Sequence, residues 1–380
     1  MRIGVFGGSF DPVHSGHLLV AEEARVGVGL SEVVFVPTFI QPFKQDMVVS
    51  PSDDRVRMLR LAIEGNPYFR VSTFEVDRAE VSYTINTLRG LRAEYEGGGL
   101  PRFARNDGDG GLRVGARNDS EAVDIAFIVG TDMFLMLEKW YLADELLREF
   151  SIILCTRPGY KEIDAAETAA MIRRKYGTNI DIIENTTFDV SSTQIRDRVA
   201  IGESIRYLVP ESVRQYLLVM AKEDEARFAH TKRVIDMAAS MAQRFGVEPE
   251  KARLAALLHD YCKENDGGVE NNLMHGRQAA DFAIRELGIT DEDVINAIAY
   301  HTTGRAGMTD LEQIIFLADT VEPGRTYKDI AELRRTSLEN LTEGTLTVLE
   351  SLAEYLVGAK FEVTEDTRDA IVDLRRRLGE

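Results

Sequence analysis

The sequence has 380 residues, of which 44% are hydrophobic and 28% are charged, a composition typical of a globular protein. A chain of this length is too long for one ordinary hydrophobic core, so we expect two domains. The formal net charge of −18 argues against a broad nucleic-acid surface, which needs clustered cations, and no apolar run approaches the roughly 20 residues that span a bilayer. Cys155 and Cys262 lack a CxxC spacing. We therefore expect a cytoplasmic protein with free thiols and neither nucleic-acid nor membrane partners.

Short β-branched runs alternate with helical patterns through the first half of the sequence. The expected strands are 2–6, 32–37, 69–76, 124–130 and 150–155, and the expected helices are 17–28, 52–64, 84–95 and 135–149. Strands that alternate with helices predict a Rossmann-like α/β domain, with a parallel sheet covered by helices on both faces. Ligands of such sheets bind at the carboxyl ends of the strands, near a topological switch point.

One segment interrupts this alternation. Residues 97–123 are rich in glycine and polar residues, and the string ARND occurs in them twice, at 104–107 and 116–119. We expect an inserted, disordered surface loop between a helix and the next strand. A functional basic loop is the alternative. The insertion costs little stability, because the entropy of closing a loop rises slowly with its length.

The strand signal disappears after about residue 222, and helical periodicity continues almost to the end. We therefore expect an α/β domain over 1–220, a junction at 221–226 and an all-α domain over 227–380. Residues 223–380 hold 31 acidic and 19 basic side chains, a net charge of −12. A polyphosphate substrate would be repelled by this half unless metal ions or local Arg and Lys side chains offset the field.

Two histidines follow the first expected strand in the string GGSFDPVHSGHL. Gly7, Gly8 and Gly16 let the backbone turn tightly and approach a phosphate group. The helix that begins near His17 favours an anion at its N-terminus. His14 and His17 can donate hydrogen bonds to a polyphosphate there, whereas the alternative is a pair of surface histidines in a turn.

The other four histidines lie in the helical second half, on successive segments. His230 precedes an apolar stripe, His275 is expected to open a helix, and His301 follows the apolar face of Val294, Ala297 and Ile298. A single histidine on such a face is usually a core residue. Together, however, four inward histidines and two aspartates would be costly to bury without a cation. The acidic members are Asp260 and Asp319. Imidazole and carboxylate ligands favour one or two divalent metals such as Fe or Mn.

The string GGSFDPVHSGHL, which contains His14 and His17, resembles the GGxFDPxHxGH signature of the nucleotidylyltransferase superfamily. Across 1–220 the match extends to bacterial nicotinate-nucleotide adenylyltransferases, through AEEA, FVPT, SYTINTL, VGTD, TRPG, SSTQIR and YLVPESV. The resemblance implies transfer of AMP from ATP to nicotinate mononucleotide, which gives nicotinate adenine dinucleotide and pyrophosphate, with Mg²⁺ on the ATP phosphates. Another adenylyl- or cytidylyltransferase, for example one acting on phosphopantetheine, and nicotinamide mononucleotide as acceptor are the alternatives.

The same resemblance assigns roles to single residues, with His14 and His17 as catalytic. It implies ATP contacts from Gly7, Gly8, Ser9, Phe10, His14, Gly16, His17, Lys44, Gly130, Asp132, Ser192, Thr193 and Arg196. It implies nicotinate-nucleotide contacts from Thr84, Thr87 and Trp140, although Trp140 also fits a core aromatic. Lys44 closes QPFK, where the family has PPHK, so Phe43 departs from the pattern. Asp11 is either catalytic or part of a structural turn.

The order H…HD…H…H…D in the second half resembles the two-metal HD superfamily of phosphohydrolases. RLAALLHDYCK, LMHG, AIAYHTTG and LEQIIFLADTVEPGR, within 225–380, look like bacterial symmetrical dinucleoside-tetraphosphate hydrolases. That resemblance implies cleavage of diadenosine tetraphosphate into two ADP, with a catalytic and bridging Asp260. The implied metal ligands are His230, His259, Asp260, His275, His301 and Asp319.

Three cations beside these motifs, Lys263, Arg305 and Arg325, are candidate phosphate contacts or surface ion-pair residues. A nucleotide-sensing regulatory module and a different phosphohydrolase are the alternatives for this domain. We expect small nucleotides as partners of the whole chain: ATP, nicotinate mononucleotide and dinucleoside polyphosphates. The sequence leaves open whether the protein forms a homo-oligomer.

Overall fold

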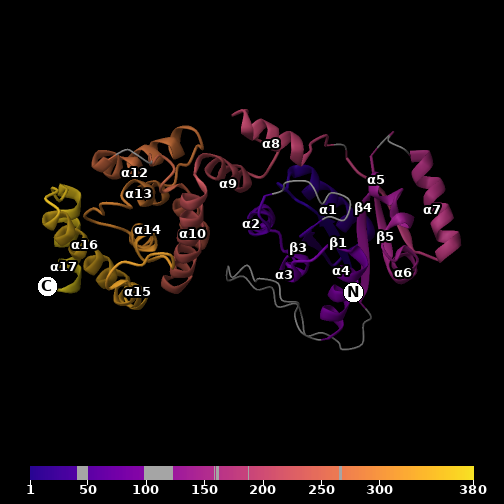
Figure 1. Cartoon of the computed structure of the whole chain (residues 1–380), viewed down its shortest axis with the longest axis horizontal. Helices are drawn as coiled ribbons and strands as arrows, with labels where there is room; N and C mark the ends of the chain where they lie inside the picture. The colour runs from indigo at the N-terminus through magenta and orange to yellow at the C-terminus, as the bar shows by residue number, and fades with distance from the viewer. Residues whose placement is uncertain (41–49, 98–122, 158, 160–161, 187, 265–267) are drawn as a thin grey trace. The chain divides into compact units, whose positions relative to one another are not determined.

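The computed structural model describes residues 1–380 except 41–49, 98–122, 158, 160–161, 187 and 265–267. The chain divides into two compact units, Met1–Arg214 and Gln215–Glu380, which are considered separately (Figure 1). The division falls inside helix α9 (Glu211–Lys222). No helix in the described parts of the chain is both long enough and apolar enough to traverse a membrane.

The first unit is built on a parallel sheet with strand order β3-β2-β1-β4-β5-β6. Its strands are β1 (Arg2–Gly8), β2 (Glu32–Pro37), β3 (Phe69–Val71), β4 (Asp124–Gly130), β5 (Ser151–Thr156) and β6 (Ile180–Glu184). Every pairing in the sheet is parallel. The chain reverses its direction of winding between β1 and β4, so a topological switch point lies at their carboxyl ends. The α/β fold expected from the sequence is thus confirmed.

Helices cover both faces of this sheet. They are α1 (Ser15–Val28), α2 (Ser52–Ile63), α3 (Phe74–Arg78), α4 (Thr84–Glu96), α5 (Thr131–Phe134), α6 (Ala143–Glu149), α7 (Glu162–Tyr176) and α8 (Ser192–Ala200), with a short 3-10 turn η1 (Leu137–Lys139). Alternate strand residues such as Val5, Phe127 and Leu154 form a core with α4, α6 and α7. Ile183 of β6 points to the other face, where it lies against Gly27 of α1.

Two expected elements differ from the structure. The expected strand 69–76 ends at Val71, and α3 begins at Phe74. The helix expected over 135–149 is broken into α5, η1 and α6, and Leu142 precedes α6 with a left-handed φ of 51° that no continuous helix allows. Strand β6 and helix α7 lie outside the elements expected from the sequence.

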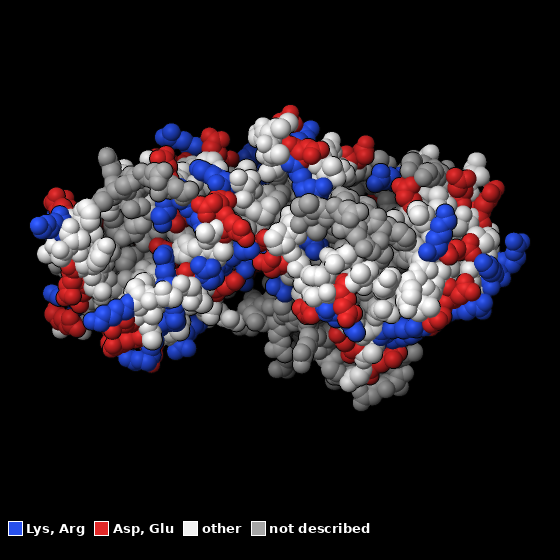
Figure 2. Space-filling view, in the orientation of Figure 1, with Lys and Arg blue, Asp and Glu red and all other residues white. Residues whose placement is uncertain are grey.

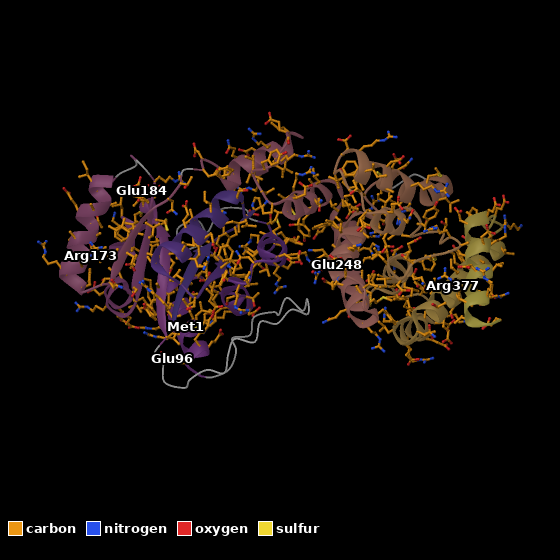
Figure 3. All side chains as sticks on the ribbon, turned by 180° about the vertical axis from the view of Figure 1, so that it is seen from behind. Met1, Glu96, Arg173, Glu184, Glu248 and Arg377 are labelled. Carbon is orange, nitrogen blue, oxygen red and sulfur yellow. The ribbon has the colours of Figure 1, made fainter. Side chains whose placement is uncertain are left out.

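The segment proposed as a disordered insertion, 97–123, lies almost wholly outside the described residues, but its two ends are placed. Tyr95 near the end of α4 donates a hydrogen bond to Glu32, the first residue of β2. Asp124, the first residue of β4, donates its amide to the carbonyl of Met1 at 3.0 Å. Figure 3 accordingly shows Glu96 beside Met1. Both ends therefore lie at the amino edge of the sheet, opposite the edge at which ligands bind.

The second unit contains only helices among its described residues, as the sequence predicted. They are α10 (Glu225–Phe245), α11 (Pro249–Leu258), α12 (Gly268–Arg285), α13 (Glu292–Ala299), α14 (Asp310–Val321), α15 (Ile330–Glu339), α16 (Leu341–Gly358) and α17 (Glu365–Leu378). Helix α14 is the centre of this unit, because it contacts α10, α11, α13, α15 and α16 and is buried from Leu311 to Ala318. His275 lies within α12 rather than at its start, which corrects one expectation.

Acidic and basic side chains are intermixed on the face of each unit shown in Figure 2. On that face the acidic side chains therefore do not form one continuous acidic patch.

Candidate active sites

A cavity of about 510 Å³ opens at the carboxyl edge of the parallel sheet. The ends of β1, β4 and β5 and the first residues of α1, α5 and α8 form its walls. Of the ATP contacts expected from the sequence, twelve line this cavity: Gly7, Gly8, Ser9, Phe10, His14, Gly16, His17, Gly130, Asp132, Ser192, Thr193 and Arg196. Lys44 lies outside the described residues. The structure thus brings together residues from three separate stretches of sequence, 7–17, 130–132 and 192–196.

His14 and His17 form a reciprocal cap at the start of α1. The Nδ1 atom of His14 accepts a hydrogen bond from the backbone amide of His17, and the Nδ1 of His17 accepts one from the amide of His14, both at 3.3 Å. Their rings stack with centroids 3.6 Å apart. Because each Nδ1 acts as an acceptor, each neutral ring carries its proton on Nε2. Two N–H donors are therefore available to a ligand in the cavity.

The pKa values of both histidines favour the neutral form. Burial, together with the charge of Arg157, lowers the pKa of His14 to about 4. Burial and the neighbouring His14 lower the pKa of His17 well below its usual value. The pair therefore offers neutral hydrogen-bond donors at pH 7 in the ligand-free protein.

The start of α8 supplies further polar groups to the same cavity. Ser191 caps the helix by accepting a hydrogen bond from the amide of Gln194 at 3.2 Å. Ser192 Oγ donates to the carbonyl of Pro12 at 2.8 Å, and Arg196 donates to the carbonyl of Asp11. A helix N-terminus with hydroxyl groups and an arginine is suited to bind phosphate.

Arg55 and Asn185, which were not among the residues expected from the sequence, also line the cavity. Arg55 is only 1% exposed, an unusual burial for an arginine. Asn185 Nδ2 donates to Glu23 at 2.7 Å. Arg55 lies in the amphipathic helix α2, at a position of the buried face where an apolar residue is expected. An arginine at such a position was the signal in the sequence that could have indicated its role.

The three expected nicotinate-nucleotide residues are not among those that line this cavity. Thr87 is buried and donates its hydroxyl to Glu75 at 2.5 Å, and Thr84 begins α4. Trp140 packs against the core of the sheet, edge-on to Phe127, with ring centroids 5.8 Å apart. The role of these three residues in binding nicotinate therefore stays a prediction.

The six expected metal ligands of the second unit converge on one cluster. His230 Nε2 lies 3.0 Å from Asp319 Oδ1, and His259 Nε2 lies 3.9 Å from the same atom. Asp260 Oδ1 lies 2.9 Å from His275 Nε2 and 3.5 Å from His301 Nε2. Three overlapping triads each bring their ligand atoms within 4.8 Å of one another: His230–His259–Asp260, His259–His301–Asp319 and Asp260–His275–His301.

The hydrogen bonds around this cluster fit a metal centre. His259 Nδ1 lies 2.6 Å from the carbonyl of Ala256, and His301 Nδ1 lies 2.8 Å from the carbonyl of Ile298. A carbonyl can only accept, so Nδ1 carries the proton and Nε2 presents its lone pair to the cluster. His259 Nε2 is fully buried and has no hydrogen-bond partner. A buried lone pair of this kind is satisfied by a cation.

The pKa values of two residues of the cluster, His259 and Asp319, favour the forms that bind metals. Burial lowers the pKa of His259 to about 4, so the ring is neutral. Burial would raise the pKa of Asp319, but its hydrogen bond with His230 and the nearby positive charges lower it below the usual range. Neutral imidazoles and ionised carboxylates are the donors that divalent metals such as Fe and Mn accept. The described cluster can therefore hold divalent metals.

Two of the three expected phosphate contacts lie beside this cluster. Lys263 Nζ lies 2.7 Å from Asp260 Oδ2, and an Arg325 Nη atom lies 2.7 Å from Asp319 Oδ1. Arg305 instead makes two hydrogen bonds of 2.7 Å to the buried Glu312. All three cations thus form ion pairs, and their role as phosphate contacts stays a prediction.

These features define a nucleotidyltransferase-type α/β domain and a helical unit with a cluster of residues that can hold divalent metals. The cytidylyltransferase-like family model matches residues 5–198, just over half of the sequence, and the chain belongs to this family. The HD domain model matches residues 227–324.

Each of the individual relatives covers only part of this chain. A probable nicotinate-nucleotide adenylyltransferase of Moorella thermoacetica is 37% identical over 216 residues, which cover 57% of this chain and 88% of the relative. A relative of the same name from Geobacillus kaustophilus is 38% identical, over 57% of this chain and 83% of its own length. The crystal structure of a predicted HD superfamily hydrolase involved in NAD metabolism, from Clostridium acetobutylicum, is 34% identical, with a TM-score of 0.41 over 43% of this chain and 96% of that one.

Proposed function

We propose that the first unit transfers AMP from ATP to nicotinate mononucleotide, releasing pyrophosphate. The observation that carries this proposal is the stacked pair His14 and His17, whose Nε2–H donors share one cavity with Arg196 and the start of α8. The relatives named as probable nicotinate-nucleotide adenylyltransferases support the choice of acceptor.

The reaction requires alignment and neutralisation of charge rather than a covalent enzyme intermediate. A phosphate oxygen of nicotinate mononucleotide attacks the α-phosphorus of ATP, and the bond from this phosphorus to the bridging oxygen breaks. The two imidazoles and Arg196 hold the phosphate oxygens as negative charge shifts to pyrophosphate. ATP would enter with Mg²⁺ on its phosphates, because Mg²⁺ favours phosphate and water oxygens over a cage of protein ligands.

For the second unit we propose hydrolysis of diadenosine tetraphosphate to two ADP. The convergence of four histidines and two aspartates in overlapping triads carries the proposal. Divalent metals held by these residues would polarise a phosphoryl group and make water a stronger nucleophile. Asp260 belongs to two of the triads and would join two metal positions, while Lys263 and Arg325 would bind phosphate oxygens and offset the acidic field of this half.

The first activity is tested by product analysis with ATP and either nicotinate or nicotinamide mononucleotide. We expect nicotinate adenine dinucleotide and pyrophosphate, with a loss of rate of about 100-fold or more in His14→Ala, because one donor to the transition state is removed. Faster turnover of nicotinamide mononucleotide would reassign the acceptor. If neither compound reacts, the unit is another nucleotidyltransferase.

The second activity is tested with diadenosine tetraphosphate and Mn²⁺ or Fe²⁺, beside a His259→Ala, Asp260→Ala double variant. ADP as the sole product, lost in the variant, is the expected result. Unsymmetrical products would indicate a different phosphohydrolase. Metal binding and nucleotide binding without turnover would favour a nucleotide-sensing module.

A further inference from the structure

The histidines of the metal cluster differ in the group that contacts Nδ1, the ring nitrogen that points away from the cluster. His259 and His301 direct Nδ1 to the backbone carbonyls of Ala256 and Ile298. His230 directs Nδ1 to a carboxylate, because Glu322 Oε1 lies 3.1 Å away. A carboxylate is a stronger acceptor than a neutral carbonyl, so the imidazole of His230 is held and polarised more strongly.

Glu322 is itself fixed in place. It is 1% exposed, and its Oε2 accepts a hydrogen bond from Arg233 Nε at 2.7 Å and another from the amide of Gly324. Arg233 lies so close to Gly324 that a Cβ at this position would be 2.5 Å from Nε. The backbone beyond α14 thus leaves room for a guanidinium that orients the carboxylate toward His230.

We propose that Glu322 is a positioning residue, which aligns His230 as a ligand and strengthens the metal position beside it. The inference rests on the metal centre proposed above. A proton on Nδ1, donated to Glu322, would leave the Nε2 lone pair free to bind a metal beside Asp319, whose Oδ1 lies 3.0 Å from Nε2. Carboxylates in this outer position typically contribute about 10- to 100-fold to metal affinity.

The effect should be confined to one end of the cluster. The rings follow one another in the order His230, His259, His301 and His275, with centroid separations of 5.7, 4.9 and 4.8 Å. Glu322 contacts the ring at one end of this series, whereas His275 and His301 approach Asp260 at the other. A change at Glu322 should therefore weaken one metal position and leave the second nearly unchanged.

Glu312, which lies in the first turn of α14, offers a matched control for Glu322 at the C-cap of this helix. Like Glu322 it is 1% exposed and bonded to an arginine, with Arg305 at 2.7 Å. The Glu312 carboxylate accepts hydrogen bonds from Arg305 and from the amide of Thr309, neither of which is a ligand of the cluster. Glu312→Gln thus removes a comparable buried charge without disturbing His230.

The test is titration of metal-stripped full-length chain with Mn²⁺, with free Mn²⁺ followed by electron paramagnetic resonance. We expect Glu322→Gln to weaken one Mn²⁺ position by about 10- to 100-fold, while Glu312→Gln binds as the native chain does. Unchanged binding in Glu322→Gln, or an equal loss in Glu312→Gln, would overturn the inference. A native chain that binds no Mn²⁺ would instead remove the metal centre of the proposed function.

A second pair of variants applies if Glu322→Gln does not fold. Arg233→Met keeps the Glu322 carboxylate but removes the guanidinium that orients it. Arg305→Met is the control variant, because it removes the corresponding arginine beside Glu312. We expect a smaller, selective loss of Mn²⁺ affinity in Arg233→Met. Equal Mn²⁺ affinities in these two variants would contradict the positioning role.

Discussion

Arg55 Nη1 donates a hydrogen bond of 2.8 Å to the carbonyl of Ser9. The same guanidinium donates from Nε to the carbonyl of Ser50 at 3.0 Å, and its charge interacts with Asp11. Asp11 in turn accepts the amide of Ser50 and lies 3.7 Å from Arg196. A buried arginine thus ties α2 to the loop after β1, which carries the residues expected to approach ATP.

Arg55→Met should destabilise the first unit strongly. It leaves two carbonyls and the buried Asp11 carboxylate without this partner, which typically costs about 3–5 kcal/mol. The sequence contains one tryptophan, and Trp140 packs against the sheet of this unit, so its fluorescence reports the unfolding of this unit in urea. Arg198→Met is the control, because Arg198 is 39% exposed and should cost less than about 1 kcal/mol. Equal urea midpoints in the two variants would contradict the proposed structural role of Arg55.

His14 makes the stability of the first unit sensitive to acid. Burial lowers its pKa to about 4, compared with 6.5 in the unfolded chain. Between these two values the unfolded chain binds a proton that the folded chain excludes, so the free energy of unfolding falls as the pH falls. Relative to His14→Asn, which can still cap α1, the native chain should lose about 3 kcal/mol between pH 7 and pH 4. Urea unfolding followed by Trp140 fluorescence measures this difference, and parallel pH curves would contradict it.

The three cations near the HD motifs should contribute unequally to hydrolysis. Lys263 and Arg325 contact ligand carboxylates of the cluster, whereas Arg305 is bound to Glu312. A lost hydrogen bond to a charged group costs about 1.5–3 kcal/mol, so kcat/KM for diadenosine tetraphosphate should fall about 10- to 100-fold in Lys263→Met or Arg325→Met. Arg305→Met should keep most of the native kcat/KM. A larger loss in Arg305→Met would show that Arg305 leaves Glu312 to bind the substrate.

The sequence predicted most of the sheet because four of its six strands are continuous apolar runs with clear ends. It failed where contacts with distant residues decide the local structure. Residues 69–76 have strand-like composition, yet the ring of Phe74 packs against Gly90 of α4 so closely that a Cβ there would lie 2.1 Å away. In strand β6 only the first residue, Ile180, is buried, and Ile182 is 44% exposed. Asp181 interrupts the apolar residues, so no continuous apolar run marked this strand.

The site residues likewise fall into those that a local sequence motif predicted and those that only the fold brings together. His14 and His17 are close in sequence and follow a glycine loop, so the motif revealed both the residues and their element. Arg55 and Glu322 act on partners 46 and 92 residues away in sequence, Ser9 and His230. Their spacing carries no signal of this contact, since the fold alone brings each pair together.

Replacing each of two glycines of α16 by alanine should change the stability of the second unit in opposite directions. An alanine normally stabilises a helix by about 1 kcal/mol relative to glycine. A Cβ at Gly344, however, would lie 2.5 Å from the Cα of Ser337, in the backbone of α15, whereas one at Gly358 would have no atom within 4 Å. Gly344→Ala should therefore destabilise the second unit by about 1–3 kcal/mol, because the backbones must move apart.

Gly358→Ala should leave this unit unchanged or more stable by up to about 1 kcal/mol. Calorimetric unfolding of the full chain, with the transition of the first unit assigned through Trp140 fluorescence, separates the two effects. The difference between the variants isolates the packing of α15 against α16, because both carry the same substitution in the same helix. If Gly344→Ala were as stable as Gly358→Ala, the close approach of these two helices would not exist in solution.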